Sequence, residues 1–128
     1  MISFDLFTSE DGSPIYMQIL RFVKRGIVSG SILHGDELPS RRVLSSLLGI
    51  NPNTVQKAYR MLEDEGLIES RSGAKSFMVL DSAAIERVRS ELIRSDVLSV
   101  VDALKQAGMS KEEALVLIEQ NWDWRERE

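Results

Sequence analysis

A group of polar and basic side chains occupies residues 53 to 60. Its members are Asn53, Thr54, Gln56, Lys57 and Arg60. An amide side chain can form two hydrogen bonds with the edge of a base, and threonine, lysine and arginine can hold a phosphate group. These residue types therefore suit a surface that reads a groove of double-stranded DNA.

A helix would have to position this group of side chains. Asn51 can cap such a helix through its side-chain oxygen, and Pro52 suits the first helical position, where its missing N–H costs nothing. Gly66 is a left-handed stop that would end it. The apolar residues of the stretch recur at three- and four-residue spacing, which predicts a buried stripe of Val55, Ala58, Tyr59 and Leu62. The polar group then points away from the core.

A shorter helix is expected immediately before this one and should end at Gly49. Its predicted apolar stripe consists of Val43, Leu44, Leu47 and Leu48. Residues 39 to 60 carry Arg41, Arg42, Lys57 and Arg60 and no acidic residue, although the whole chain has a formal net charge of -4. In a single amphipathic helix, exposure to solvent would explain these residue types as well as DNA binding does. Two helices around a tight turn, with local positive charge, instead predict a helix-turn-helix that reads DNA.

Another helix should precede this pair. Ser13 is expected to cap it, Pro14 lies in its first turn, and Gly30 ends it. Its apolar stripe keeps four-residue spacing through Ile15, Ile19, Val23 and Ile27. Residues 1 to 12, which end in the turn-like Glu10-Asp11-Gly12, predict no regular structure. His34 is interpreted as a solvated residue of the loop that follows.

A β-hairpin is predicted after the helix pair. Residues 67–71 and 76–80 are its two short strands, joined by the loop Ser72-Gly73-Ala74-Lys75. Alone, this hairpin could be an edge ribbon that covers the core. Three helices followed by a hairpin predict a winged helix, so the expected fold class is α+β, mainly α, with an N-terminal winged helix-turn-helix.

The tail from residue 81 is predicted to be helical. Residues 82–107 contain no glycine or proline and keep an apolar stripe, Gly108 ends that helix, and Ser110 to Glu113 form a capping box for a second one. The two helices have too little partner surface in their own chain, so a second subunit is expected to cover them; the alternative is that they fold back on the winged helix. The expected dimerisation residues are Leu92, Val97, Val101, Leu104, Ile118 and Trp122. The predicted division is a DNA-binding domain at 1–80 and a dimerisation tail at 81–128.

Composition excludes several classes of protein. The chain of 128 residues has no cysteine and one histidine, and it lacks a glycine-rich phosphate loop and a recognisable pair of carboxylates, so neither an enzyme, a metal site nor a cofactor is expected. No apolar run approaches the roughly 18 residues of a membrane span, and no secretory signal is evident, which predicts a cytoplasmic protein. Residues 81–128 hold 7 basic and 11 acidic side chains, which makes the tail by itself a poor DNA ligand.

With these residues the chain resembles a GntR-family transcription regulator, and specifically the small YtrA-type subfamily. Four segments carry the resemblance, at residues 14–19, 35–44, 48–59 and 62–68, and together they cover most of residues 14 to 80. The resemblance implies that Arg42 contacts DNA, that Asn53, Thr54 and Gln56 face the groove, and that Gly73 lets the tip of the wing approach the minor groove. It also implies that the tail is a two-helix dimerisation module.

Two positions depart from the family pattern. Lys75 replaces the second glycine of the wing, where it could substitute a contact with phosphate or the minor groove. Pro52 stands where many members carry a DNA-contacting arginine, so base reading should depend on the neighbouring amides.

The predicted function is a sequence-specific regulator, a repressor that binds a palindromic DNA operator as a homodimer. Its predicted DNA-binding residues are Ser40, Arg41, Arg42, Asn51, Asn53, Thr54, Gln56, Lys57, Arg60, Gly73 and Lys75. The alternative is a winged helix that docks an acidic protein partner through its basic side chains; steep salt dependence would distinguish DNA binding. The sequence identifies neither an operator nor an effector ligand.

Overall fold

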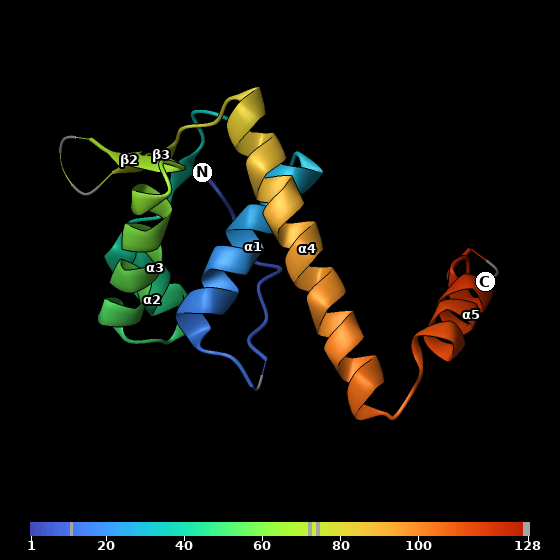
Figure 1. The fold of residues 1–128 in the computed structure, drawn as a ribbon. Helices are drawn as coiled ribbons and strands as arrows, with labels where there is room; N and C mark the ends of the chain where they lie inside the picture. Colours follow the sequence, from blue (N-terminus) through green and yellow to red (C-terminus); the bar gives the residue numbers. More distant parts are fainter. Residues whose placement is uncertain (11, 72, 74, 127–128) are drawn as a thin grey trace. The chain divides into compact units, whose positions relative to one another are not determined.

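The computed structural model describes residues 1–10, 12–71, 73 and 75–126; Asp11, Ser72 and Ala74, which belong to the two predicted turns, lie outside this part. Its elements follow in the order α1 (Ile15–Ser29), β1 (Glu37–Leu38), α2 (Arg41–Leu48), α3 (Pro52–Asp64), β2 (Ile68–Ser70), β3 (Ser76–Met78), α4 (Ser82–Gln106) and α5 (Lys111–Asn121) (Figure 1). The chain divides into two compact units, Met1–Leu92 and Ile93–Glu128. The predicted fold class, a winged helix-turn-helix followed by two helices, is confirmed.

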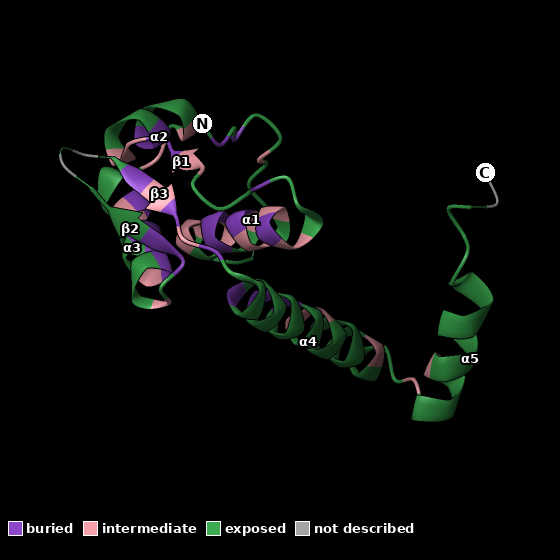
Figure 2. Cartoon of the chain, turned by 90° about the horizontal axis from the view of Figure 1, so that it is seen from above, coloured by how far each residue is buried: buried purple, intermediate pink, exposed green. Residues whose placement is uncertain are grey.

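The core of the first unit lies between α1, α3 and the sheet, where the buried residues gather in Figure 2. The predicted stripe of α3 is confirmed, because all four of its side chains, Val55, Ala58, Tyr59 and Leu62, have no exposed surface. Each large apolar side chain buried in this way contributes about 1.5–3 kcal/mol. Ala84 and Val88, from the first turns of α4, complete the same core. The division predicted at residue 80 concerns function and stays a prediction.

The start of α1 differs from its prediction in one detail. Its N-cap is Pro14, without a side-chain cap bond, so the predicted Ser13 cap is wrong. The Gln18 side chain ties down the preceding segment instead: its Nε2 donates to the carbonyls of Ser13 and Glu10, and its Oε1 accepts from the Glu10 N–H, each at 2.8 Å. The Gln18 side chain therefore holds Glu10 and Ser13 beside the start of α1 and does not cap the helix.

The N-terminal segment is packed, although its sequence predicts no regular structure. The Ile2 N–H donates to the Glu37 carbonyl at 2.7 Å, and the Phe4 ring stacks on Phe22 of α1 with 5.0 Å between the ring centroids. Ile2 and Phe4 are both buried in the core. The segment therefore covers α1 with aromatic side chains.

Only part of the predicted apolar stripe of α2 faces the core: Leu44 is buried and Leu48 packs against the core. Val43 and Leu47 are 48% and 67% exposed, whereas Leu44 is fully buried and Ser45 lies beside it in the core. The pairs 43/47 and 44/48 share the same four-residue spacing, so periodicity alone does not decide which pair faces inward. Ser45 can be buried because its hydroxyl donates to the Ile50 carbonyl at 2.6 Å.

The predicted hairpin is confirmed, with strands shorter than expected, and it belongs to a three-stranded antiparallel sheet of order β1-β3-β2. Ile68 of β2 lies opposite Met78 of β3, and both are buried against the helices. Glu37, Phe77 and Glu69 lie side by side on the opposite, outer face. The sheet thus has one face in the core and one face available to solvent.

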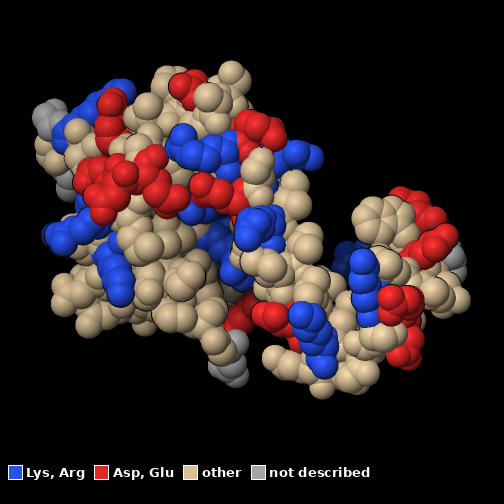
Figure 3. All heavy atoms as spheres, viewed as in Figure 1, with Lys and Arg blue, Asp and Glu red and all other residues tan. Residues whose placement is uncertain are grey.

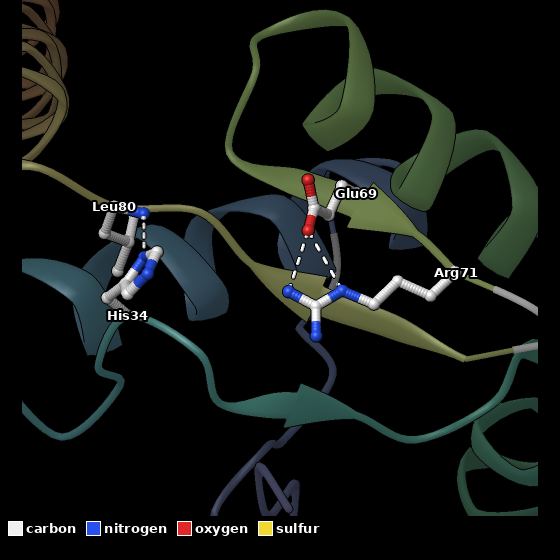
Figure 4. Close-up of polar contacts among 4 residues, drawn as sticks. All are labelled: His34, Glu69, Arg71 and Leu80. Atoms are coloured by element: carbon white, nitrogen blue, oxygen red, sulfur yellow. Dashed lines mark hydrogen bonds and ion pairs between the residues drawn. The ribbon is translucent and has the colours of Figure 1, made fainter.

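The loop before β1 is tied to the end of the sheet by His34. Its Nδ1 accepts a hydrogen bond from the Leu80 N–H at 3.0 Å (Figure 4). His34 is exposed, as predicted, but its side chain satisfies a backbone donor just before α4 begins. The interpretation as a purely solvated loop residue is therefore incomplete.

The second unit consists of the later part of α4 and α5. The predicted capping box is confirmed: the Ser110 hydroxyl accepts from the Glu113 N–H, and the Glu113 carboxylate accepts from the Ser110 N–H, both at 3.2 Å. No residue of α5 is buried, although the helix is described throughout. Its apolar side chains and those of α4 line an open groove of about 910 Å³. Among the described residues, none of the helices combines the length and the hydropathy that a membrane-spanning segment needs.

Candidate nucleic-acid interface

Side-chain hydrogen bonds cap the beginnings of both α2 and α3. The Ser40 hydroxyl accepts from the Val43 N–H at 3.2 Å and so caps α2. Gly49 takes a left-handed φ of 64°, which turns the chain, and the Asn51 side-chain oxygen then accepts from the Asn53 N–H at 2.8 Å to cap α3. Ser40 and Asn51, two predicted site residues, thus fix where the two helices begin.

Tyr59 joins α3 to the beginning of α2. Its hydroxyl donates to the carbonyl of Pro39 at 2.6 Å, and the Arg41 guanidinium lies over its ring, 5.1 Å from the centroid. Burial raises the pKa of the Tyr59 phenol far above its ordinary value, and the nearby charge of Arg41 opposes this shift in part. The predicted contact residue Arg41 therefore also has a structural partner within the protein.

The polar group of α3 lies on the surface, as its spacing predicted. Asn53, Lys57 and Arg60 are exposed, Thr54 and Gln56 are half-buried, and Arg42 of α2 is exposed as well. The N-terminal part of α3 therefore presents amides and cations together, near backbone N–H groups whose helix dipole favours an anion.

A residue that the sequence analysis did not identify supports this group. The Lys57 ammonium lies over the ring of Tyr16 in α1, 3.9 Å from the centroid. Such a contact contributes about 0.5–1 kcal/mol at an exposed site and restricts the lysine side chain before any ligand arrives. Tyr16 belongs to the first segment that resembles the family, and only this resemblance could have pointed to it.

The wing brings a second missed residue to the interface. Gly73 has a left-handed φ of 79° at the tip, and Lys75 follows it on the exposed surface. Opposite Lys75 lies Arg71, whose Nε and Nη2 donate to the Glu69 carboxylate at 3.0 and 2.8 Å (Figure 4). Arg71 could have been noticed as a cation directly before the predicted loop.

Charge is divided along α3. Acidic side chains gather near its C-terminal end, beside the wing (Figure 3). Two of them are engaged within the protein, since Glu63 accepts from the Ser70 hydroxyl at 2.6 Å and Glu65 forms an ion pair with Lys24 at 2.8 Å. The cations Lys57 and Arg60 lie nearer the beginning of the helix. A polyanion would therefore be attracted to the N-terminal part of α3.

The described residues contain no group of three or more His, Cys, Asp or Glu side chains that could hold a metal ion. The arrangement of side chains on α2, α3 and the wing suits binding rather than bond-making chemistry.

The sequence of this chain is also similar to the sequences of known proteins. Residues 15–78 match the family model "Bacterial regulatory proteins, gntR family". The chain is 34% identical to the HTH-type transcriptional repressor YtrA of Bacillus subtilis, over 88% of this chain and 82% of that protein. It is 32% identical to the uncharacterized HTH-type transcriptional regulator YhcF of the same organism, over 83% and 88% of the two chains.

Solved structures are similar over most of the chain. A GntR family transcriptional regulator from Listeria monocytogenes has a TM-score of 0.72 at 28% identity and covers 88% of this chain and 98% of its own. YtrA from Sulfolobus acidocaldarius, a GntR-family transcription factor, has a TM-score of 0.54 at 32% identity, with coverages of 93% and 94%. This chain therefore belongs to the gntR family of bacterial regulatory proteins, as a DNA-binding transcription regulator of the YtrA type and not an enzyme.

Proposed function

We propose that this protein is a cytoplasmic repressor that binds a palindromic DNA operator as a homodimer. The observation that carries the proposal is the N-terminal part of α3, where Asn53 and Lys57 are exposed and Gln56 is half-buried, on a helix whose opposite side is fully buried. The name of its Bacillus subtilis relative, a repressor, supports the direction of regulation.

Within this proposal the site residues divide into two roles. Amides and the hydroxyl at the start of α3 read base edges, and this set consists of Asn51, Asn53, Thr54 and Gln56. Cations and small donors hold the phosphate backbone, and this set consists of Ser40, Arg41, Arg42, Lys57, Arg60 and Lys75. Gly73 allows the wing to come close to the DNA. Residues 1–80 would then be the DNA-binding domain.

The proposed dimer uses residues 81–128. Val97, Val101, Leu104, Ile118 and Trp122 line the groove formed by α4 and α5, and Trp122 is 79% exposed. A group of exposed apolar side chains that line one groove is typical of a protein interface. Leu92, also predicted as a dimerisation residue, is only 8% exposed, so it contributes least to this proposal. Two copies joined in this way would present two α3 helices to half-sites about one helical turn apart.

Selection of bound sequences from random duplex DNA with the purified protein tests the proposed function. We expect enrichment of an inverted repeat whose two halves have the spacing that a two-fold symmetric dimer requires. Binding should weaken log-linearly as salt concentration rises. Failure to enrich any sequence, together with salt-independent retention of DNA, would contradict a sequence-specific regulator.

The two proposed roles predict different effects of alanine. Arg42→Ala should weaken binding to every duplex and lower the salt slope by about one unit, whereas Asn53→Ala should cost about 1–3 kcal/mol on the operator alone. Asn53→Ala keeps the α3 cap, because the capping bond uses its backbone N–H. Lys57→Ala should have the same kind of effect as Arg42→Ala, and Gln56→Ala the same kind of effect as Asn53→Ala. Binding isotherms on operator and random duplex at several salt concentrations measure both effects; equal losses on both duplexes for all four variants would refute the assignment.

A further inference from the structure

Three side chains lie together on the outer face of the wing. Glu69 of β2 is directly opposite Phe77 of β3, and the Arg71 guanidinium lies over the Phe77 ring, 4.4 Å from its centroid. Arg71 also donates two hydrogen bonds to a single Glu69 carboxylate oxygen, at 3.0 and 2.8 Å (Figure 4). The guanidinium is thus held on the hairpin by the Phe77 ring and by the Glu69 carboxylate.

Arg71 is also the cross-strand neighbour of Lys75. Its N–H donates to the Lys75 carbonyl at 2.9 Å, which continues the pairing of β2 and β3 by one residue toward the left-handed Gly73. Residues opposite each other in such a pair project from the same face. Two cations in this position repel each other, and the Glu69 carboxylate offsets that repulsion in the free protein.

The ion pair between Glu69 and Arg71 is one that an incoming anion can replace at little cost. Both side chains are more than half exposed, at 51% and 57%, and exposed pairs of this kind contribute about 0–1 kcal/mol. Figure 4 shows the third guanidinium nitrogen directed away from Glu69. A phosphate group can accept two parallel hydrogen bonds from an arginine, whereas here one carboxylate oxygen accepts both.

We infer that Arg71 and Lys75 together bind a backbone phosphate of the DNA. In the free protein Glu69 holds Arg71 on Phe77, and the phosphate then replaces Glu69 as the partner of Arg71. The inference rests on the proposed DNA-binding function. Glu69 is then a positioning residue that lowers affinity, because its pair with Arg71 must be given up on binding. Phe77 supports the guanidinium in both states.

Glu69→Gln tests the inference, because it removes the competing charge and keeps the shape of the side chain. We expect binding to any duplex to become about 2- to 5-fold tighter near 0.1 M salt, the range that an exposed ion pair accounts for. Arg71→Gln should weaken binding about tenfold and lower the salt slope by about one unit. In the Arg71→Gln background, Glu69→Gln should have no further effect.

Glu37→Gln is the matched control. Glu37 lies on the same outer face, on the other side of Phe77, so its substitution changes the local charge equally without touching the pair. Equal tightening by Glu37→Gln and Glu69→Gln, or tightening by Glu69→Gln that persists without Arg71, would show a general charge effect and overturn the inference. If the wild-type protein binds DNA and Glu69→Gln does not tighten this binding, the inference is wrong and the proposed function still stands. Wild-type protein that binds no duplex would overturn the proposed function with it.

Discussion

The Ile118→Asp substitution is expected to convert the protein into a monomer and to weaken operator binding by about 10²–10⁴-fold, the avidity that two linked half-sites provide. Ile118 lines the groove of the second unit, where a charge would be buried by a partner and could not be solvated. A substitution is preferable to truncation after Leu80, because Ala84 and Val88 belong to the core of the first unit. Truncation would remove core and interface together.

Fluorescence and light scattering measure this effect directly. Trp122 and Trp124 are the chain's two tryptophans, and both line the groove. Their emission should shift to longer wavelength when the wild-type protein is diluted into monomers, and it should be independent of concentration in Ile118→Asp. Ser99→Asp, on an exposed position of α4 outside the groove, is the control for added charge. A dimeric Ile118→Asp protein, or one with wild-type operator affinity, would contradict the proposed interface.

The Tyr59→Phe substitution is expected to lower the free energy of unfolding by about 1–3 kcal/mol at neutral pH, because it leaves a buried carbonyl without its partner. Tyr59 has no exposed surface, and its hydroxyl donates to the carbonyl of buried Pro39 at 2.6 Å. This bond fixes where α2 begins relative to α3. Its loss should therefore also weaken operator binding, although Tyr59 cannot touch DNA.

The difference between the two proteins should decrease at alkaline pH. Burial raises the pKa of the folded Tyr59 phenol, with Arg41 opposing, whereas the phenol of the unfolded chain ionises near pH ~10. Above that pH the unfolded state binds fewer protons than the folded state, so the stability contributed by Tyr59 falls by about 1.4 kcal/mol per pH unit. Tyr59→Phe lacks this phenol and should lose less stability over the same interval.

Urea unfolding of both proteins between pH 8 and pH 11 tests this expectation. The two proteins share every other ionisable group, so the difference in free energy of unfolding isolates the effect of Tyr59. Below pH ~10 the two stability curves should run parallel, and above it they should converge. Curves that stay parallel throughout would show that the phenol is not held neutral by burial.

Local signals in the sequence were sufficient to predict most of the helices. Asn51 with Pro52, the Ser110–Glu113 capping box and the left-handed Gly49 act within a few residues of where they stand, and the structure confirms each of them. The three- and four-residue spacing of α3 was decisive, because every member of its predicted apolar stripe is buried and no member of its predicted polar group is. The resemblance to the family added the expected DNA contacts of Arg42 and of Gly73 in the wing, and both stay predictions.

Other features depended on contacts between residues distant in the sequence. One such feature is which apolar side chains of α2 are buried. Leu44 and Val43 have equivalent spacing, and only packing against α3 decides that Leu44 faces the core. The pairing of β1 with β3, the hydrogen bond from Leu80 to His34 and the Lys57 ammonium over Tyr16 join segments 38 or more residues apart. No local propensity encodes such a partner. By itself, the sequence determined the helices, the wing and the family, whereas the tertiary structure decided which side chains hold the cations of the interface in place, because that choice depends on which elements pack together.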